Sequence, residues 1–122
     1  MLVRTVVLLS IVVSASGAHL EVSATAAIAQ VLCHLEHTCS GPQCAVLDWI
    51  ITAEATTSEE RTLARAVRRI LHTPHPDDLG ALQALRESPA TPPDIRELAG
   101  IVESFVHVAT MEQRESLAAL SR

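Results

Sequence analysis

The chain has 122 residues, with nine basic and fourteen acidic side chains and a formal net charge of −5. This length accommodates one small domain rather than a two-domain enzyme. One Trp, one Phe and no Tyr leave Ala, Leu, Val and Ile to build the core, and the acidic balance disfavours binding to nucleic acids or anionic membrane surfaces.

The first eighteen residues have the pattern of a secretion signal. Arg4 provides a basic start, residues 5–15 form an apolar run, and small residues at 16–18 precede His19. Such a run is too short to anchor the chain across a bilayer. We therefore expect removal of residues 1–18 and a secreted or periplasmic domain over residues 19–122, with no transmembrane segment left.

Cleavage after Ala18 would make His19 the mature N-terminus. A terminal amine together with its own imidazole can bind copper when one further histidine completes the site. The cut can equally fall one to three residues earlier, so this hypothesis depends on the processing position.

The next segment contains Cys33, His34, His37, Cys39 and Cys44. In an exported chain two of three cysteines can form a disulfide, and the third is left free or pairs with another chain. We expect the pair Cys39–Cys44, because residues at the two mouths of a helical hairpin are neighbours. The alternative is a Zn or Cu site formed by Cys33, His34, His37 and Cys39, since thiolate and imidazole suit these metals.

Segments 55–85 and 90–120 resemble each other at an offset of 35 residues. They share ten identities in 31 aligned positions, whereas chance in so Ala- and Leu-rich a chain supplies only about three. Another step of 35 residues towards the N-terminus reaches a more divergent first copy. The sequence therefore predicts three repeats, over about residues 20–54, 55–89 and 90–122.

Within each repeat the apolar residues have helical spacing. The first run follows the pattern i, i+4, i+7, i+8, with Leu63, Val67, Ile70 and Leu71. A second run with Leu79 and Leu82 comes after a turn. Each repeat is expected to contain a helix of about 15 residues, a turn and a helix of about 10 residues. The predicted fold class is all-α, with six helices in three tandem helix–turn–helix repeats that form either a short α-solenoid or a closed helical bundle.

The repeats place His37, His72 and His107 at equivalent positions. Three imidazoles can bind Zn or Cu. Neighbouring helical repeats, however, usually lie about 10 Å apart, which is too far for three rings to share one metal. We therefore expect these histidines in the last helical turns, where they interact with the helix dipole and the free carbonyls.

No catalytic constellation is recognisable. The four glycines form no phosphate-binding loop, and no lysine is present for Schiff-base or general-base chemistry. We expect a small exported, non-catalytic module without a cofactor that binds a protein or peptide, because stacked helical repeats present a continuous surface. The alternative function is metal or redox handling by the Cys33, His34, His37 and Cys39 cluster.

Overall fold

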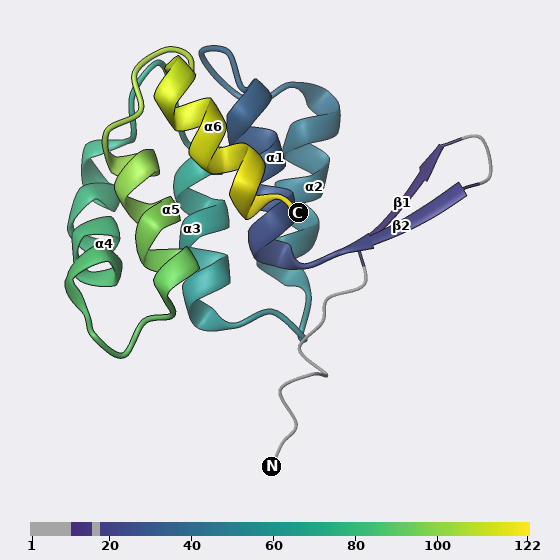
Figure 1. Cartoon of the computed structure of the whole chain (residues 1–122), viewed down its shortest axis with the longest axis horizontal. Helices are drawn as coiled ribbons and strands as arrows, with labels where there is room; N and C mark the ends of the chain where they lie inside the picture. Colours follow the sequence, from purple (N-terminus) through teal and green to yellow (C-terminus); the bar gives the residue numbers. More distant parts are fainter. Residues whose placement is uncertain (1–10, 16–17) are drawn as a thin grey trace.

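The computed structural model describes residues 11–15 and 18–122. From Ala24 onward the domain is all-helical with six helices, as predicted (Figure 1). The elements in chain order are β1 (Ile11–Ala15), β2 (Ala18–Val22), α1 (Ala24–His34), α2 (Gly41–Thr52), α3 (Ser58–Arg68), α4 (Pro76–Glu87), α5 (Pro93–Glu103) and α6 (Met111–Leu120).

Strands β1 and β2 form an antiparallel hairpin before the first helix. His19, the predicted mature N-terminus, lies in β2 opposite Ser14. The predicted signal peptide includes residues 1–10 and 16–17, which lie outside the described residues, and its removal stays a prediction. Within the described ranges, none of the helices has the length and apolar character needed to cross a membrane.

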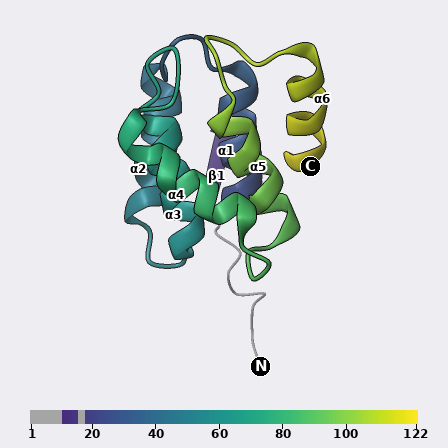
Figure 2. The same cartoon turned by 90° about the vertical axis from the view of Figure 1, so that its left-hand side faces the viewer.

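The six helices form two layers around a common axis. Helices α1, α3 and α5 lie inside and contact one another, and each outer helix packs mainly on the inner helix of the next repeat. Thus α2 packs on α3, α4 packs on α5, and α6 returns to pack on α1 (Figures 1 and 2). Because the last helix contacts the first, the repeats form a closed bundle rather than an open solenoid.

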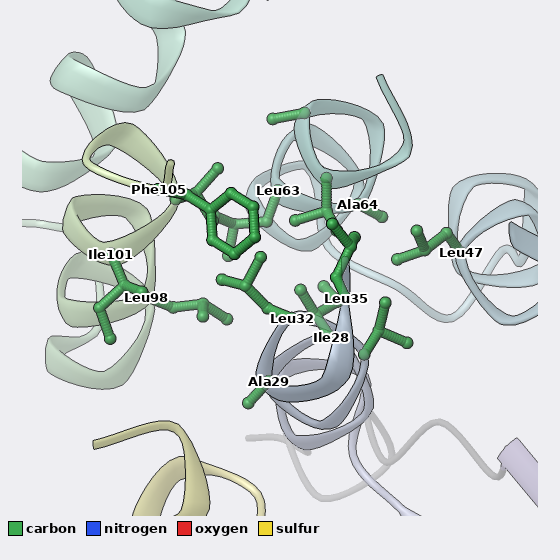
Figure 3. Close-up of a cluster of buried hydrophobic side chains, with 14 of the residues drawn as sticks. Ile28, Ala29, Leu32, Leu35, Leu47, Leu63, Ala64, Leu98, Ile101 and Phe105 are labelled. Carbon is green, nitrogen blue, oxygen red and sulfur yellow. The ribbon is translucent and has the colours of Figure 1, made fainter. Parts of the chain in front are cut away.

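Equivalent residues of the three 35-residue repeats are buried together in the core. At four positions in the first half of the repeat, all three copies are at most 1% exposed. These triplets are Ile28, Leu63 and Leu98; Ala29, Ala64 and Ala99; Leu32, Val67 and Val102; and Leu35, Ile70 and Phe105. Figure 3 shows such side chains from the three inner helices pointing toward one another. The helical periodicity therefore predicted these positions correctly, whereas Leu71 and Leu79 of the predicted apolar runs are 69% and 39% exposed.

The first helix of each repeat is shorter than the sequence suggested. Helices α1, α3 and α5 have 11 residues each, rather than about 15. Each ends three or four residues before the repeat-equivalent histidine, whose positive φ a right-handed helix does not allow. The residues Leu35, Ile70 and Phe105 remain buried although they lie outside the helices.

Candidate metal centre

A tight turn centred on a histidine follows each inner helix. Among the described residues other than glycine, positive φ occurs at His37, His72 and His107, with values of 68°, 67° and 69°. Left-handed backbone costs an L-residue about 1–2 kcal/mol, although histidine adopts it more often than most residues. Three costly turns at equivalent positions therefore require an explanation beyond chain reversal. We call these three residues the histidine cluster.

The backbones of the histidine cluster form a closed ring of hydrogen bonds. The amide of His37 donates to the carbonyl of His107 at 2.9 Å, and the amide of His72 donates to the carbonyl of His37 at 2.7 Å. The amide of His107 completes the ring by donating to the carbonyl of His72 at 2.5 Å. The three turns are thus related by an approximate threefold axis and hold one another in place.

The imidazole rings converge on this axis. His37 Nδ1 lies 3.1 Å from His72 Nε2, and His72 Nδ1 lies 3.3 Å from His107 Nδ1. One ring nitrogen from each residue can be chosen so that all three lie within 4.8 Å of one another. A tetrahedral zinc ion, with Zn–N bonds of about 2.0–2.1 Å, separates its nitrogen ligands by about 3.4 Å. The three nitrogens are therefore close enough to reach one ion.

The expectation that these rings lie too far apart to share a metal is wrong, as is their expected place in the last helical turns. The repeats do not stack in a row at a constant spacing. They close into a ring, and this places equivalent positions around a common axis instead of along a line. All three histidines lie beyond the helix ends.

The surroundings of His37 favour its unprotonated form. Partial desolvation, and then the positive charges that His107 and His72 can carry, lower the pKa of His37, while Glu36 opposes this shift. A metal binds the unprotonated imidazole, so a lowered pKa assists it. Helices α1, α3 and α5 all end on this side of the bundle (Figures 1 and 2), and the negative ends of their dipoles also favour a cation.

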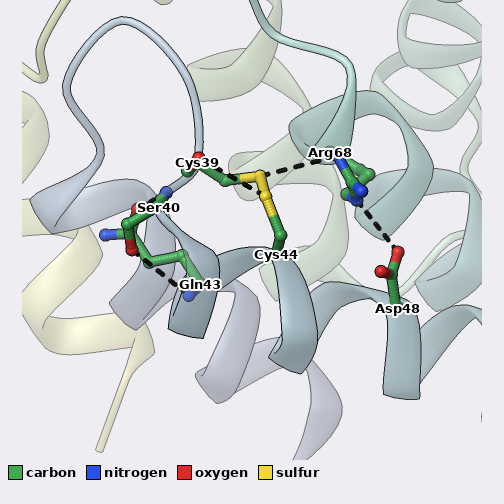
Figure 4. The surroundings of a disulfide bond; sticks show 6 residues. All are labelled: Cys39, Ser40, Gln43, Cys44, Asp48 and Arg68. Atoms are coloured by element: carbon green, nitrogen blue, oxygen red, sulfur yellow. Dashed lines mark hydrogen bonds and ion pairs between the residues drawn. A yellow bond between two sulfur atoms is a disulfide. The ribbon is translucent and has the colours of Figure 1, made fainter.

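The cysteine pair expected from the sequence lies two residues beyond His37. The Cα atoms of Cys39 and Cys44 are 5.3 Å apart and their sulfur atoms are at bonding distance (Figure 4). This pair connects the turn after α1 with the first turns of α2. Beside it, Arg68 of α3 binds Asp48 of α2, with 2.9 Å between Nε and Oδ1. The disulfide is therefore placed to support the turn of the first repeat.

The alternative cluster of Cys33, His34, His37 and Cys39 is not brought together. Cys39 is paired with Cys44, Cys33 is a half-buried free thiol, and His34 is exposed at the end of α1. The imidazole of His37 instead contacts those of the other two repeats. Within the described part of the chain, the histidine cluster is the group of three or more ligands close enough to hold a metal. The repeat alignment identified its members, but not their convergence.

Comparison with known proteins does not assign a family. No family model, curated protein or solved structure matches this chain. The functional inference therefore rests on the geometry and chemistry of the histidine cluster.

Proposed function

We propose that the protein binds one divalent transition-metal ion, of the Zn²⁺ or Cu²⁺ class, through His37, His72 and His107. The observation that carries this proposal is the convergence of three imidazoles from three separate turns, each with positive φ. Folding alone does not require it, because left-handed turns cost free energy. Imidazole nitrogen is, by contrast, a preferred ligand of zinc and copper.

The fold supports this site before any metal arrives. The residues two positions before each histidine, Leu35, Ile70 and Phe105, are at most 1% exposed and anchor the turns in the core. The backbone ring then fixes the turns relative to one another. Ligands that are held near their bound positions lose little conformational freedom on binding. Metal is thus expected to bind the folded protein rather than to drive its folding.

Calorimetric titration with Zn²⁺ tests this function. The wild-type chain should bind one ion, and His72→Asn should weaken binding by more than about 100-fold, since even loss of a hydrogen bond to a metal ligand costs 10–100-fold. Asn tolerates left-handed backbone, so the turn itself is preserved in this variant.

Two histidines outside the cluster provide matched controls. His34 is exposed at the end of α1, and His75 caps α4 by accepting a hydrogen bond from the amide of Asp77. His34→Asn and His75→Asn should both bind Zn²⁺ like the wild type, and Asn also preserves the cap. Absence of micromolar Zn²⁺ binding to the wild type, or unchanged binding to His72→Asn, would contradict the proposal.

A second candidate function is the protein or peptide binding expected from the repeat architecture. It is supported by three largely exposed apolar side chains on the turns and helix start at the end of the bundle that carries the histidine cluster, since exposed apolar patches mark interaction sites. Leu71, Val106 and Met111 are 69%, 64% and 80% exposed. The disulfide suits an oxidising compartment, which supports an exported location for either binding function.

This candidate is tested with the double variant Leu71→Ser/Val106→Ser. Both side chains are exposed, so the variant should fold and bind Zn²⁺ like the wild type. A specific partner from the exporting cell's envelope or medium should be retained by the immobilised wild-type protein and lost by the variant. Equal retention by both proteins would exclude these side chains as the binding surface.

A further inference from the structure

The histidine cluster supplies fewer ligands than a metal requires. It offers three nitrogen donors, whereas Zn²⁺ in proteins takes four ligands and Cu²⁺ prefers tetragonal coordination. In the described part of the chain no carboxylate or thiolate joins the group. The carbonyls of the three histidines are already acceptors in the backbone ring. The described part of the chain therefore leaves at least one coordination position open.

The missing coordination position faces solvent rather than the protein interior. The inner side of the turns is occupied by Leu35, Ile70 and Phe105, which are almost completely buried and have no polar side-chain atom. The side chains of His72 and His107 are exposed at the end of the bundle. A ligand from solution can thus reach the metal without any movement of the core.

The charge of the site selects the class of ligand. Three neutral imidazoles leave a divalent ion with its full formal charge, so an anionic fourth ligand is electrostatically preferred over a neutral one. A site with three protein ligands and one exchangeable position is the arrangement of catalytic and ligand-binding metal centres, whereas structural centres are closed by four protein ligands. We infer that the metal bound by His37, His72 and His107 keeps an open position that takes a small monodentate anion from solution. This inference rests on the proposed metal binding.

Cobalt substitution makes the open position visible, because Co²⁺ replaces Zn²⁺ and absorbs in the visible range according to its coordination. The wild-type protein, loaded with one equivalent of Co²⁺, is titrated with sodium azide. We expect a saturable spectral change that corresponds to one azide per cobalt, at one chain per metal. His72→Asn serves as the blank and should show neither the protein-bound cobalt spectrum nor the azide response.

Glu36 is the carboxylate to exclude as an internal fourth ligand, since it directly precedes His37 and is exposed. If it is not a ligand, Glu36→Gln should give the same cobalt spectrum and azide response as the wild type. A wild-type spectrum that azide does not change overturns the inference, and so does an azide response that appears only in Glu36→Gln. A ratio of two chains per cobalt in sedimentation also overturns it, because a second copy then fills the position. Failure to bind Co²⁺ and Zn²⁺ would instead remove the metal site itself.

Discussion

The two ends of the inner helices are built in different ways, although the same three repeats form both. At the end where the helices finish, all three turns have a histidine with φ between 67° and 69° and share one ring of hydrogen bonds. At the end where they begin, each repeat differs. Ser23 caps α1, Thr57 caps α3 through a capping box with Glu60, and α5 begins after Pro92 without a side-chain cap.

This difference separates the features that folding alone explains, at the helix starts, from the features that it does not explain, at the helix ends. Helix starts can be stabilised by several unrelated residues, and the three repeats use three solutions. Helix ends can likewise be closed in several ways, most simply with a glycine that adopts left-handed backbone at no steric cost. The turns after the three inner helices nevertheless all place histidine at the position with positive φ. This end of the bundle, the histidine end, therefore meets a requirement that chain reversal does not impose.

The largest expected effect comes from a substitution in the core, because the core supports both ends of the inner helices. Phe105→Ala removes a fully buried side chain and should lower the free energy of unfolding by about 3–5 kcal/mol. Chemical denaturation measures this loss. Val106→Ala, one residue further and 64% exposed, should stay within about 0.5 kcal/mol of the wild type. A similar loss in both variants would mean that the turn, not the core beneath it, holds this end.

The disulfide tests whether the histidine end depends on a covalent link. Cys39→Ser/Cys44→Ser should lower the free energy of unfolding by about 2 kcal/mol, as expected for a short closed loop. Zn²⁺ affinity should be unchanged, because the equivalent turns of the other repeats carry Pro74 and Ala109 in place of Cys39 and still have the same φ at the histidine. Denaturation and Zn²⁺ titration of the same variant separate the two effects. A Zn²⁺ affinity that falls with the disulfide would show that the first repeat does not hold its turn unaided.

The buried faces of the helices could be predicted because helical periodicity is a local property. Leu63 and Leu98 align at the 35-residue offset and both are completely buried. The cysteine pair was equally accessible to reasoning, since Cys39 and Cys44 are five residues apart and flank a turn. In each case residues close in sequence determine the answer.

The closed ring and the metal centre could not be predicted in the same way. The same apolar faces can serve an open row or a ring, and the choice depends on small angles between successive repeats that no single residue sets. The positive φ at His72 has no sequence signature either. A glycine in a turn often indicates positive φ, whereas a histidine usually has negative φ. Without closure, His37 and His107 lie at opposite ends of a row, and the cluster does not exist.

The free-energy cost of positive φ at the histidine end can be measured by comparing alanine and glycine at position 72. At most positions alanine is the more stabilising of the two, and here the order should be reversed. In metal-free protein, His72→Gly should be more stable than His72→Ala by about 0.5–1 kcal/mol, because alanine is penalised by positive φ and glycine is not. Ala118 is exposed within α6, where helical backbone favours alanine over glycine. Ala118→Gly should therefore lower the free energy of unfolding by about 1 kcal/mol. The free energies of unfolding of these variants give the comparison. If alanine is also the more stable residue at position 72, the turn is not left-handed in solution.

Acidification should affect the histidine end and leave the helix starts unchanged. Because desolvation, His107 and His72 lower the pKa of His37 in the folded protein, the unfolded chain binds more protons near pH 6, and stability therefore falls as pH decreases. The melting temperature of the metal-free protein should be lower at pH 5 than at pH 7.5, and His37→Asn should reduce this difference. Thr57→Ala, which removes the α3 cap and costs about 1 kcal/mol, should melt lower at every pH but with the wild-type dependence. Equal pH dependence in the wild type and His37→Asn would mean that the clustered imidazoles do not influence one another in solution, and the contrast between the two ends would then rest on backbone geometry alone.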